Sequence, residues 1–271
     1  MPFTLIKGEF VPEAGKPDGD SMRFRPIDPT PLFMLKRKGR PPKINQTNGT
    51  IQLRFEGIDT MESKAADPFS SDATKSNLAL CGVPDGTGTA PGYILTNQIG
   101  PNGRPIAFVY AGTNTAADGA SIFLEGEQLK ESVNYKQLEL GHAYPLYYDT
   151  LFFSLRQVLT EAVTKARSSN LNVWGADLTN SGANYSGPDS LLTMPPIFPK
   201  LWRRLDKYSR DSDTMNPNSL AEFEEYMESI REERVFILSE SNATGFDDII
   251  EVSGNEIELE YLPEDIVVVS V

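Results

Sequence analysis

The sequence predicts a mixed α+β protein in which short strands and helices come first and an acidic extension follows. Three observations predict this fold class. Apolar and polar residues alternate in several short segments before residue 111, which is typical of strands. Residues 149–169 carry apolar side chains at helical spacing. Residues 1–174 contain 18 basic and 18 acidic residues, whereas residues 175–271 contain 7 and 20, so the second part carries the whole net charge of −13.

Five short segments of the first part are predicted to be strands. Glycine and proline are common between them, as expected for turns. In one segment Ile51, Leu53 and Phe55 share one face, so this face can enter a core while the opposite face stays polar. The predicted strands are residues 3–11, 22–25, 51–56, 93–96 and 106–110.

Three segments of the same part are predicted to be helices. Residues 67–82 end at a glycine, residues 130–142 end near another, and residues 149–169 begin with Asp149, which is placed to cap that helix. Five short strands with three helices suit a small, partly open Greek-key β-barrel of the oligonucleotide-binding (OB) type. We therefore expect a five-stranded OB-type barrel over residues 1–175.

Residues 176–271 are expected to form an acidic α+β extension. Residues 175–200 are rich in glycine, asparagine, serine and proline, which is typical of a linker or an irregular strap. Residues 219–222 form a capping box that predicts a helix to about residue 234. Four strand-like segments follow, and residues 253–255 predict a hairpin between the middle two. They are residues 235–238, 249–252, 257–261 and 266–269.

The composition limits the classes of function. No stretch approaches the length of a membrane span, and the start lacks the pattern of an export signal, so we expect a cytoplasmic protein by default. Cys81 is the single cysteine, which excludes an intrachain disulfide, and its apolar neighbours predict a buried thiol. His142 is the single histidine, which excludes a two-histidine metal site and argues against a Ser-His-Asp triad.

A cluster of oxygen-bearing side chains follows the third predicted strand. Asp59, Thr60 and Glu62 lie within four residues, too many such groups to be buried together without a cation or a proton partner. A polar turn at the end of an ordinary strand has the same pattern. Two further motifs carry related chemistry, because Asp20 ends an Asp-Gly-Asp turn and Arg104 precedes another apolar strand.

These motifs, followed by Leu-Asn-Val-Trp at residues 171–174, resemble the staphylococcal nuclease (thermonuclease) family over about residues 5–174. The resemblance implies an OB-type barrel. It also implies Ca²⁺-dependent hydrolysis of phosphodiester bonds in DNA and possibly RNA, with little sequence specificity and with 3′-phosphate ends. The strand-end motif keeps the family's internal spacing at Arg54, Asp59, Thr60 and Glu62.

The resemblance also implies roles for these residues. Asp20, Asp59 and the backbone carbonyl of Thr60 would bind Ca²⁺, a hard cation that prefers oxygen ligands. Arg54 and Arg104 match the family's two catalytic arginines. Their planar forks fit phosphate oxygens in a way that a lysine cannot reproduce.

A carboxylate and an aromatic pair complete the implied site. Glu62 would orient or deprotonate the attacking water. Tyr147, with Tyr148 or Tyr144 beside it, would stack a base or donate to a phosphate. The chain departs from the family at Met61, where a proline usually stiffens the turn.

Several features have structural alternatives. The insert at residues 26–50 contains a basic segment, residues 36–43, which could be a solvated hairpin tip or could grip phosphates. Arg54 could form a structural ion pair with Glu56 or Glu62.

Two other functions use the same barrel. The first is a binding module without catalysis. The second is a regulated or partner-binding protein, in which the acidic extension binds a protein partner or holds the nuclease off by mimicking DNA. The extension could equally support the barrel from its back face.

Overall fold

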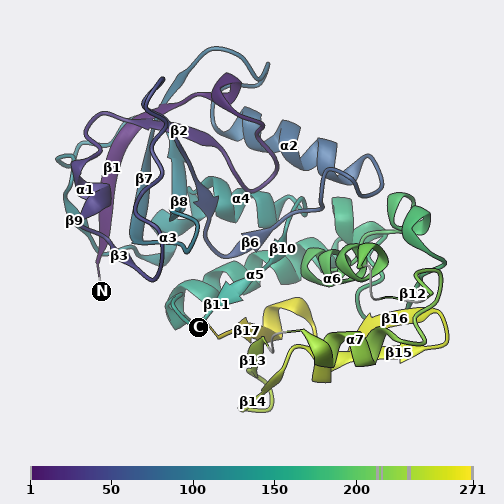
Figure 1. The fold of residues 1–271 in the computed structure, drawn as a ribbon. Helices are drawn as coiled ribbons and strands as arrows, with labels where there is room; N and C mark the ends of the chain where they lie inside the picture. The colour runs from purple at the N-terminus through teal and green to yellow at the C-terminus, as the bar shows by residue number, and fades with distance from the viewer. Residues whose placement is uncertain (1, 212–213, 215, 231–232, 270–271) are drawn as a thin grey trace.

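The computed structural model describes residues 2–211, 214, 216–230 and 233–269. It is a mixed α+β protein built around one nearly closed sheet (Figure 1). The sheet order is β4-β2-β1-β7-β8-β5, and its two end strands are β4 (Ile51–Gln52) and β5 (Arg54–Phe55). Along the chain these two strands are separated by Leu53 alone, so the sheet must curve back on itself into a barrel.

The other strands of this path lie where the sequence predicts them. They are β1 (Phe3–Phe10), β2 (Arg23–Pro26), β7 (Ala90–Ile99) and β8 (Pro105–Ala111). Neighbours from β2 through β1 and β7 to β8 are antiparallel, and β5 pairs with β8 in parallel. Two short strands lie off the path: β3 (Lys36–Arg37) pairs with β7, and β9 (Ser121–Ile122) pairs with β1.

The helices of the first part correct two predictions. The predicted helix at 130–142 is shorter and begins only at Val133, because Ser132 leaves the helical conformation and its Oγ accepts a hydrogen bond from the Tyr135 amide at 3.1 Å. Asp149 does not cap the long helix, because the helix begins at Phe153, its N-cap residue is Phe152 and no side chain forms a capping hydrogen bond there. The helices are α1 (Thr30–Phe33), α2 (Phe69–Leu80), α3 (Gly126–Lys130), α4 (Val133–Glu139) and α5 (Phe153–Ser168).

Within the residues of the extension that the structure describes there are two α-helices, α6 (Pro199–Arg210) and α7 (Phe223–Ser229). The composition did not indicate α6, which begins where the expected linker ends. The predicted capping box is wrong, because α7 begins after Glu222 and the Ser219 Oγ accepts from the Ala221 amide within a turn.

The four predicted strands of the extension are confirmed. They are β13 (Arg234–Ile237), β15 (Ile250–Ser253), β16 (Glu256–Leu259) and β17 (Ile266–Val268), and β15 and β16 form the expected hairpin. Two more strands were not predicted, β12 (Ala183–Asn184) on β16 and β14 (Asn242–Gly245) on β13.

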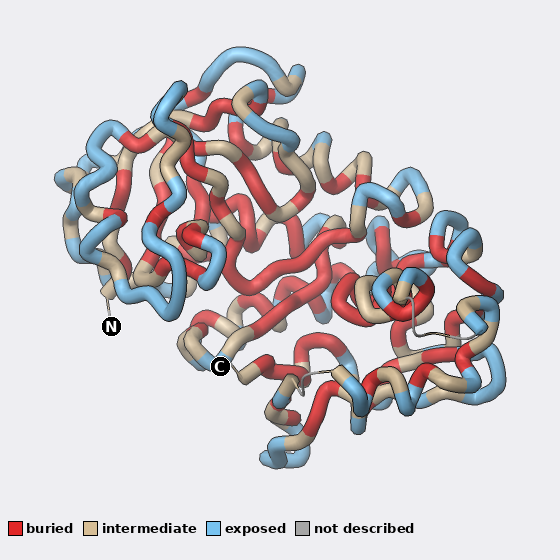
Figure 2. The backbone as a smooth tube through the Cα atoms, viewed as in Figure 1, coloured by how far each residue is buried: buried red, intermediate tan, exposed pale blue. Residues whose placement is uncertain are grey.

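The extension is joined to the first part by strand pairing and by a shared core. β17 of the extension pairs in parallel with β11 (Tyr147–Tyr148) of the first part. Within the first part, β10 (Tyr144–Pro145) pairs with β6 (Ile58–Asp59). Buried side chains from both parts form one hydrophobic cluster, and Figure 2 shows the buried backbone running through both. The expected boundary at residue 175 therefore marks a change of composition inside a continuous core. Across the described ranges, no helix combines the length and apolar character needed to cross a bilayer.

Candidate active site at the barrel edge

The aspartate turn before β2 packs directly against the segment that follows β6. A Cβ atom added to Gly19 would lie 2.7 Å from Cγ2 of Thr60 and 2.7 Å from Cβ of Ala73. The approach is close enough to require glycine at this position. The amide of Phe55 donates to the carbonyl of Asp20 at 3.0 Å, which ties the same turn to β5. The fold therefore brings Asp20 next to the strand-end motif.

Three carboxylates lie close together at this point. Burial raises the pKa of Asp20 well above its usual value, and the negative charges of Asp18 and Asp59 raise it further, while Arg54 lowers it. Asp59 and Thr60 are themselves buried. Such a group of carboxylates is stabilised by a cation or by a proton.

Arg54 extends from β5 toward these carboxylates. Its Nη2 donates to the hydroxyl of Tyr148 at 3.1 Å, and its guanidinium carbon lies 5.3 Å from the centre of the Tyr148 ring. Burial lowers the pKa of Arg54, but Tyr148, Asp59 and Asp20 outweigh this effect and raise it. Arg54 is therefore held charged beside the acidic group, paired directly with a neutral hydroxyl.

Arg104 reaches the same place from the turn before β8. Gly103 adopts φ +78, and its amide donates to the carbonyl of Gly100 at 2.9 Å, so the turn needs glycine. Burial lowers the pKa of Arg104, and the like charge of Arg54 lowers it further, whereas Asp20 raises it. Two like charges thus lie close enough to disfavour one another, which is the situation expected where an anion binds.

Asp59 and Glu62 are bound by an arginine that the sequence reasoning missed. Nη1 and Nη2 of Arg203, on α6, donate to Oδ1 and Oδ2 of Asp59 at 3.1 Å and 2.6 Å. Nη1 also donates to Oε1 of Glu62 at 2.8 Å. Burial lowers the pKa of Arg203, but these two carboxylates outweigh it and raise the pKa above its usual value.

A helical pattern in α6 could have revealed this arginine. Leu201, Trp202, Leu205 and Tyr208 are buried and recur at helical spacing behind Pro199, which suits a first turn. The proline-rich composition before residue 199 concealed the signal. Even with the helix predicted, its contact with Asp59 would not follow, since the two residues are 144 positions apart.

The three candidate tyrosines have different surroundings. Tyr148 contacts Arg54, as described above. Tyr147 is fully buried, and its hydroxyl forms a hydrogen bond with Oγ1 of Thr160 at 3.1 Å. Tyr144 is also fully buried, and its hydroxyl donates to Asp177. The expectation that Tyr147 stacks a base is therefore wrong, because its ring has no exposed face.

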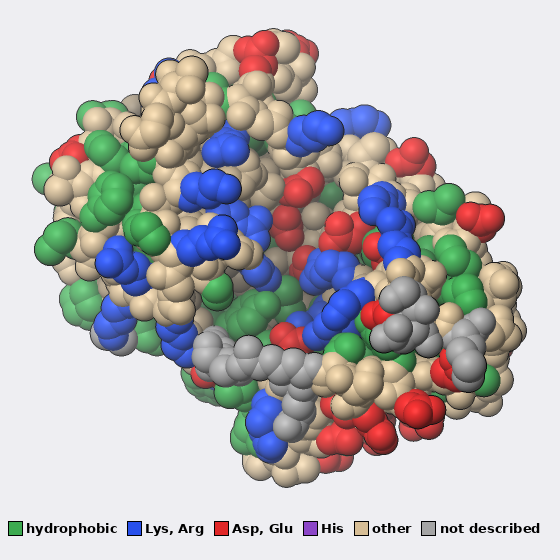
Figure 3. All heavy atoms as spheres, in the orientation of Figure 1, with side chains coloured by type: hydrophobic (Ala, Val, Ile, Leu, Met, Phe, Trp, Pro, Cys, Tyr) green, Lys and Arg blue, Asp and Glu red, His purple; other side chains and the backbone are tan. Residues whose placement is uncertain are grey.

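The basic insert lies against the turn that carries Arg104. The amide of Lys43 donates to the carbonyl of Gly103 at 2.9 Å, and the amide of Arg40 donates to the carbonyl of Pro101 at 3.1 Å. The side chains of Arg40 and Lys43 are exposed. Figure 3 shows acidic side chains in a hollow between two groups of lysine and arginine side chains. The backbone of the insert is therefore packed onto the barrel while its cations face solvent.

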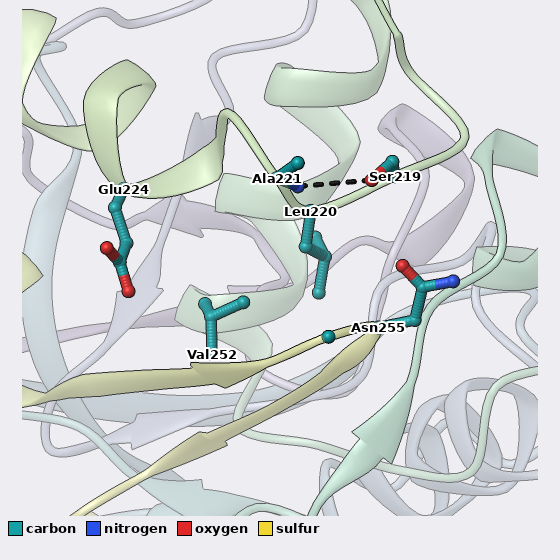
Figure 4. Close-up of a pocket in the computed structure, with 7 residues that line it drawn as sticks. Ser219, Leu220, Ala221, Glu224, Val252 and Asn255 are labelled. Atoms are coloured by element: carbon teal, nitrogen blue, oxygen red, sulfur yellow. Dashed lines mark hydrogen bonds between the residues drawn. The ribbon is translucent and has the colours of Figure 1, made fainter.

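A second depression lies between the start of α7 and the β15–β16 hairpin (Figure 4). Leu220, Val252 and Asn255 line it, and Glu224 supplies the one charged side chain of its lining. All of its lining residues belong to the extension. It does not combine opposite charges as the barrel edge does, so the barrel edge is the stronger candidate site.

No family model matches this chain, and no curated protein matches it. Among the residues that the structure describes, no group of three or more His, Cys, Asp or Glu side chains is arranged to hold a metal ion.

Proposed function

We propose that the protein hydrolyses phosphodiester bonds in DNA and possibly RNA, as a thermonuclease-like enzyme on a five-stranded, OB-type Greek-key barrel. The observation that carries the proposal is the convergence of three segments that are distant in the chain and that together supply three acidic and two basic side chains. Asp20 comes from the turn before β2, Arg54 from β5, Asp59 and Glu62 from β6 and the segment after it, and Arg104 from the turn before β8.

Arg54 and Arg104 are proposed to bind the scissile phosphate. Each lowers the cost of the extra negative charge that develops on the phosphate in the transition state. Because the two guanidinium groups repel one another in the absence of an anion, a phosphate between them relieves an unfavourable contact. Tyr148 fixes one side of the Arg54 fork and presents a partly exposed ring that a base could stack on.

Calcium is proposed as the cofactor on the basis of the resemblance and of the acidic group. Asp20 fits a cation, because burial and neighbouring carboxylates disfavour its charged form, and a bound cation would stabilise that form. Asp59 and the carbonyl of Thr60 would complete the set, provided that Arg203 releases Asp59. A bound calcium would polarise the phosphate. Glu62 would orient the attacking water and take its proton.

Stacking and phosphate contacts carry little base information, so we expect low sequence specificity on both DNA and RNA. The exposed cations of the insert extend the phosphate-binding surface beyond Arg104. The resemblance implies 3′-phosphate products.

The test is cleavage of single-stranded DNA, duplex DNA and RNA, with Ca²⁺ and with a chelator. We expect wild-type cleavage that the chelator abolishes, a loss of roughly 100-fold or more in Glu62→Gln, and wild-type rates in the exposed control Arg210→Gln. Cleavage that persists in Glu62→Gln, or that is absent from every reaction of the folded wild-type protein, would overturn the proposal.

One observation favours a second candidate, a nucleic-acid binding module without catalysis. Arg203 holds both the implied metal ligand Asp59 and the implied base Glu62. If Arg203 stays on these carboxylates permanently, the cleft between the barrel edge and α6 can bind phosphate groups but cannot cleave phosphodiester bonds. Retention of oligonucleotides without cleavage, weakened in Arg54→Ala, is the result expected for this alternative.

A further inference from the structure

Arg203 occupies the carboxylates to which the proposed function assigns cation binding and water activation. Its fork engages both oxygens of Asp59, at 3.1 Å and 2.6 Å, and Nη1 also reaches Glu62 at 2.8 Å. A divalent cation bound to Asp59 would meet this guanidinium at close range, and like charges repel. Arg203 and a cation therefore cannot share Asp59 in this arrangement.

The guanidinium can leave without displacing its helix. α6 is held by its opposite face, where Leu201, Trp202 and Leu205 are buried and Nε1 of Trp202 donates to the carbonyl of Leu191 at 3.2 Å. The side chain of Arg203 is 39% exposed. Rotation about its own bonds can carry the charged group away from Asp59 and into solvent, since long cationic side chains readily keep their charged end in water.

Three other cations of α6 pair within the extension itself. Lys200 and Arg204 both bind Glu233, at 2.6 Å and 2.7 Å, and Arg210 binds Asp206 at 2.6 Å. Arg203 differs from them, because both of its partners belong to the barrel part. It is therefore the cation through which α6 acts on the candidate site.

We infer that Arg203 is an internal counter-ion that exchanges with calcium at Asp59. The inference rests on the proposed function, in which Asp59 binds the cation. Without calcium, Arg203 neutralises Asp59 and Glu62. When calcium binds, the two hydrogen bonds between Arg203 and Asp59 break and the guanidinium moves away. The extension thereby sets the calcium affinity of the barrel through a positive charge.

Calcium titration of the full chain by calorimetry tests the exchange. Arg203 acts as a competitor for Asp59. The apparent calcium affinity is the intrinsic affinity multiplied by the fraction of molecules in which Asp59 is free. We expect Arg203→Gln to bind calcium about tenfold more tightly than the wild-type protein. Arg210→Gln removes a similar ion pair from the same helix and is expected to leave the affinity within about twofold. Asp59→Asn is expected to abolish binding.

Two results would overturn the inference in distinguishable ways. Equal affinity in Arg203→Gln and wild type, with binding lost in Asp59→Asn, would remove the exchange and leave the calcium site of the proposed function intact. If neither the wild-type protein nor Arg203→Gln binds calcium, both the exchange and the calcium site of the proposed function are refuted. Circular dichroism of each variant establishes that it is folded.

A second measurement avoids substitution at Arg203. The side-chain Nε–H resonances of Arg203 and Arg210 are followed by NMR during calcium titration of the wild-type protein. We expect the Arg203 resonance to shift and the Arg210 resonance to stay in place. An unmoved Arg203 resonance at a calcium concentration that saturates the protein would contradict the exchange.

Discussion

The two walls of the cleft both supply arginine, but the partners of the arginines differ. On the barrel wall, Arg54 donates to the neutral hydroxyl of Tyr148, and Arg104 lies beside a like charge. On the helix wall, Arg203 is neutralised by Asp59 and Glu62. The arginines of the barrel wall can therefore bind an anion, whereas the arginine of the helix wall is already neutralised. The partners of an arginine, and not the residue type, decide whether it can bind a phosphate.

The walls are also held by different forces. Backbone hydrogen bonds of the β5–β8 pair place the barrel wall in addition to burial of apolar side chains, whereas α6 belongs to no sheet and depends mainly on its buried apolar face. Hydrogen bonds fix geometry closely, whereas apolar burial is non-directional. The two walls can therefore be perturbed separately.

The largest effect is expected from the barrel wall. Arg54→Lys keeps the positive charge but loses the planar fork that can hold two phosphate oxygens. Removal of one such donor from a transition-state site typically costs 10²- to 10³-fold in rate, and we expect at least about 100-fold here in the cleavage assay. The matched change on the other wall, Arg203→Lys, is expected to leave most of the rate. Equal losses in the two variants would show that the walls do not differ.

The helix wall is best disturbed through its anchor. Leu205 is fully buried, so Leu205→Ala is expected to lower the free energy of unfolding by about 2 to 5 kcal/mol. Urea unfolding followed by circular dichroism measures it. Leu192→Ala, at a 51% exposed position, is the control and should change stability by less than about 0.5 kcal/mol. A small effect at Leu205 would contradict the proposed anchoring of α6 by apolar burial.

A buried acid supports the barrel wall next to Arg54. Burial raises the pKa of Glu56 to about 7 from its usual 4.5, against the opposing effects of Arg54, Gln98 and the Gly57 amide. Between these values the folded state holds a proton that the unfolded state has lost, so stability falls as the pH rises from about 4.5 to 7. Over this range we expect the wild type to lose about 2 to 3 kcal/mol more than Glu56→Gln. Urea titrations at several pH values measure the difference, and parallel pH profiles would refute it.

The sequence was sufficient for those parts of the site that depend on local pattern. Apolar patterning predicts the strand that carries Arg54 and the strand that follows Arg104, and glycines mark the turns beside them. Convergence of these residues follows from closure of the barrel. The metal, the substrate and the reaction stay predictions.

Contacts between segments that are distant in the chain could not be predicted from the sequence. Neighbouring residues of a strand point to opposite sides, so Tyr147 and Tyr148 cannot both face the cleft. Which of the two tyrosines faces the cleft depends on the pairing of their strand with Val267 and Val268. In this pairing Tyr147 is buried and Tyr148 lies beside Arg54. Neither this pairing nor the Arg203 contact has a local signal.

The smallest effect is expected at the outer end of the barrel wall, where the insert meets the Arg104 turn. Arg40→Gln with Lys43→Gln removes two exposed charges without touching their backbone hydrogen bonds. If both contact phosphates of duplex DNA, the slope of log affinity against log salt should become shallower by about 0.9 for each charge removed, with a modest loss of affinity at physiological salt. Fluorescence anisotropy with a labelled duplex in chelator measures binding without cleavage. Lys165→Gln, an exposed position on α5, serves as the single-charge control. An unchanged slope in the double variant would confine the phosphate-binding surface to Arg54 and Arg104, and would return the insert to the role of a solvated hairpin.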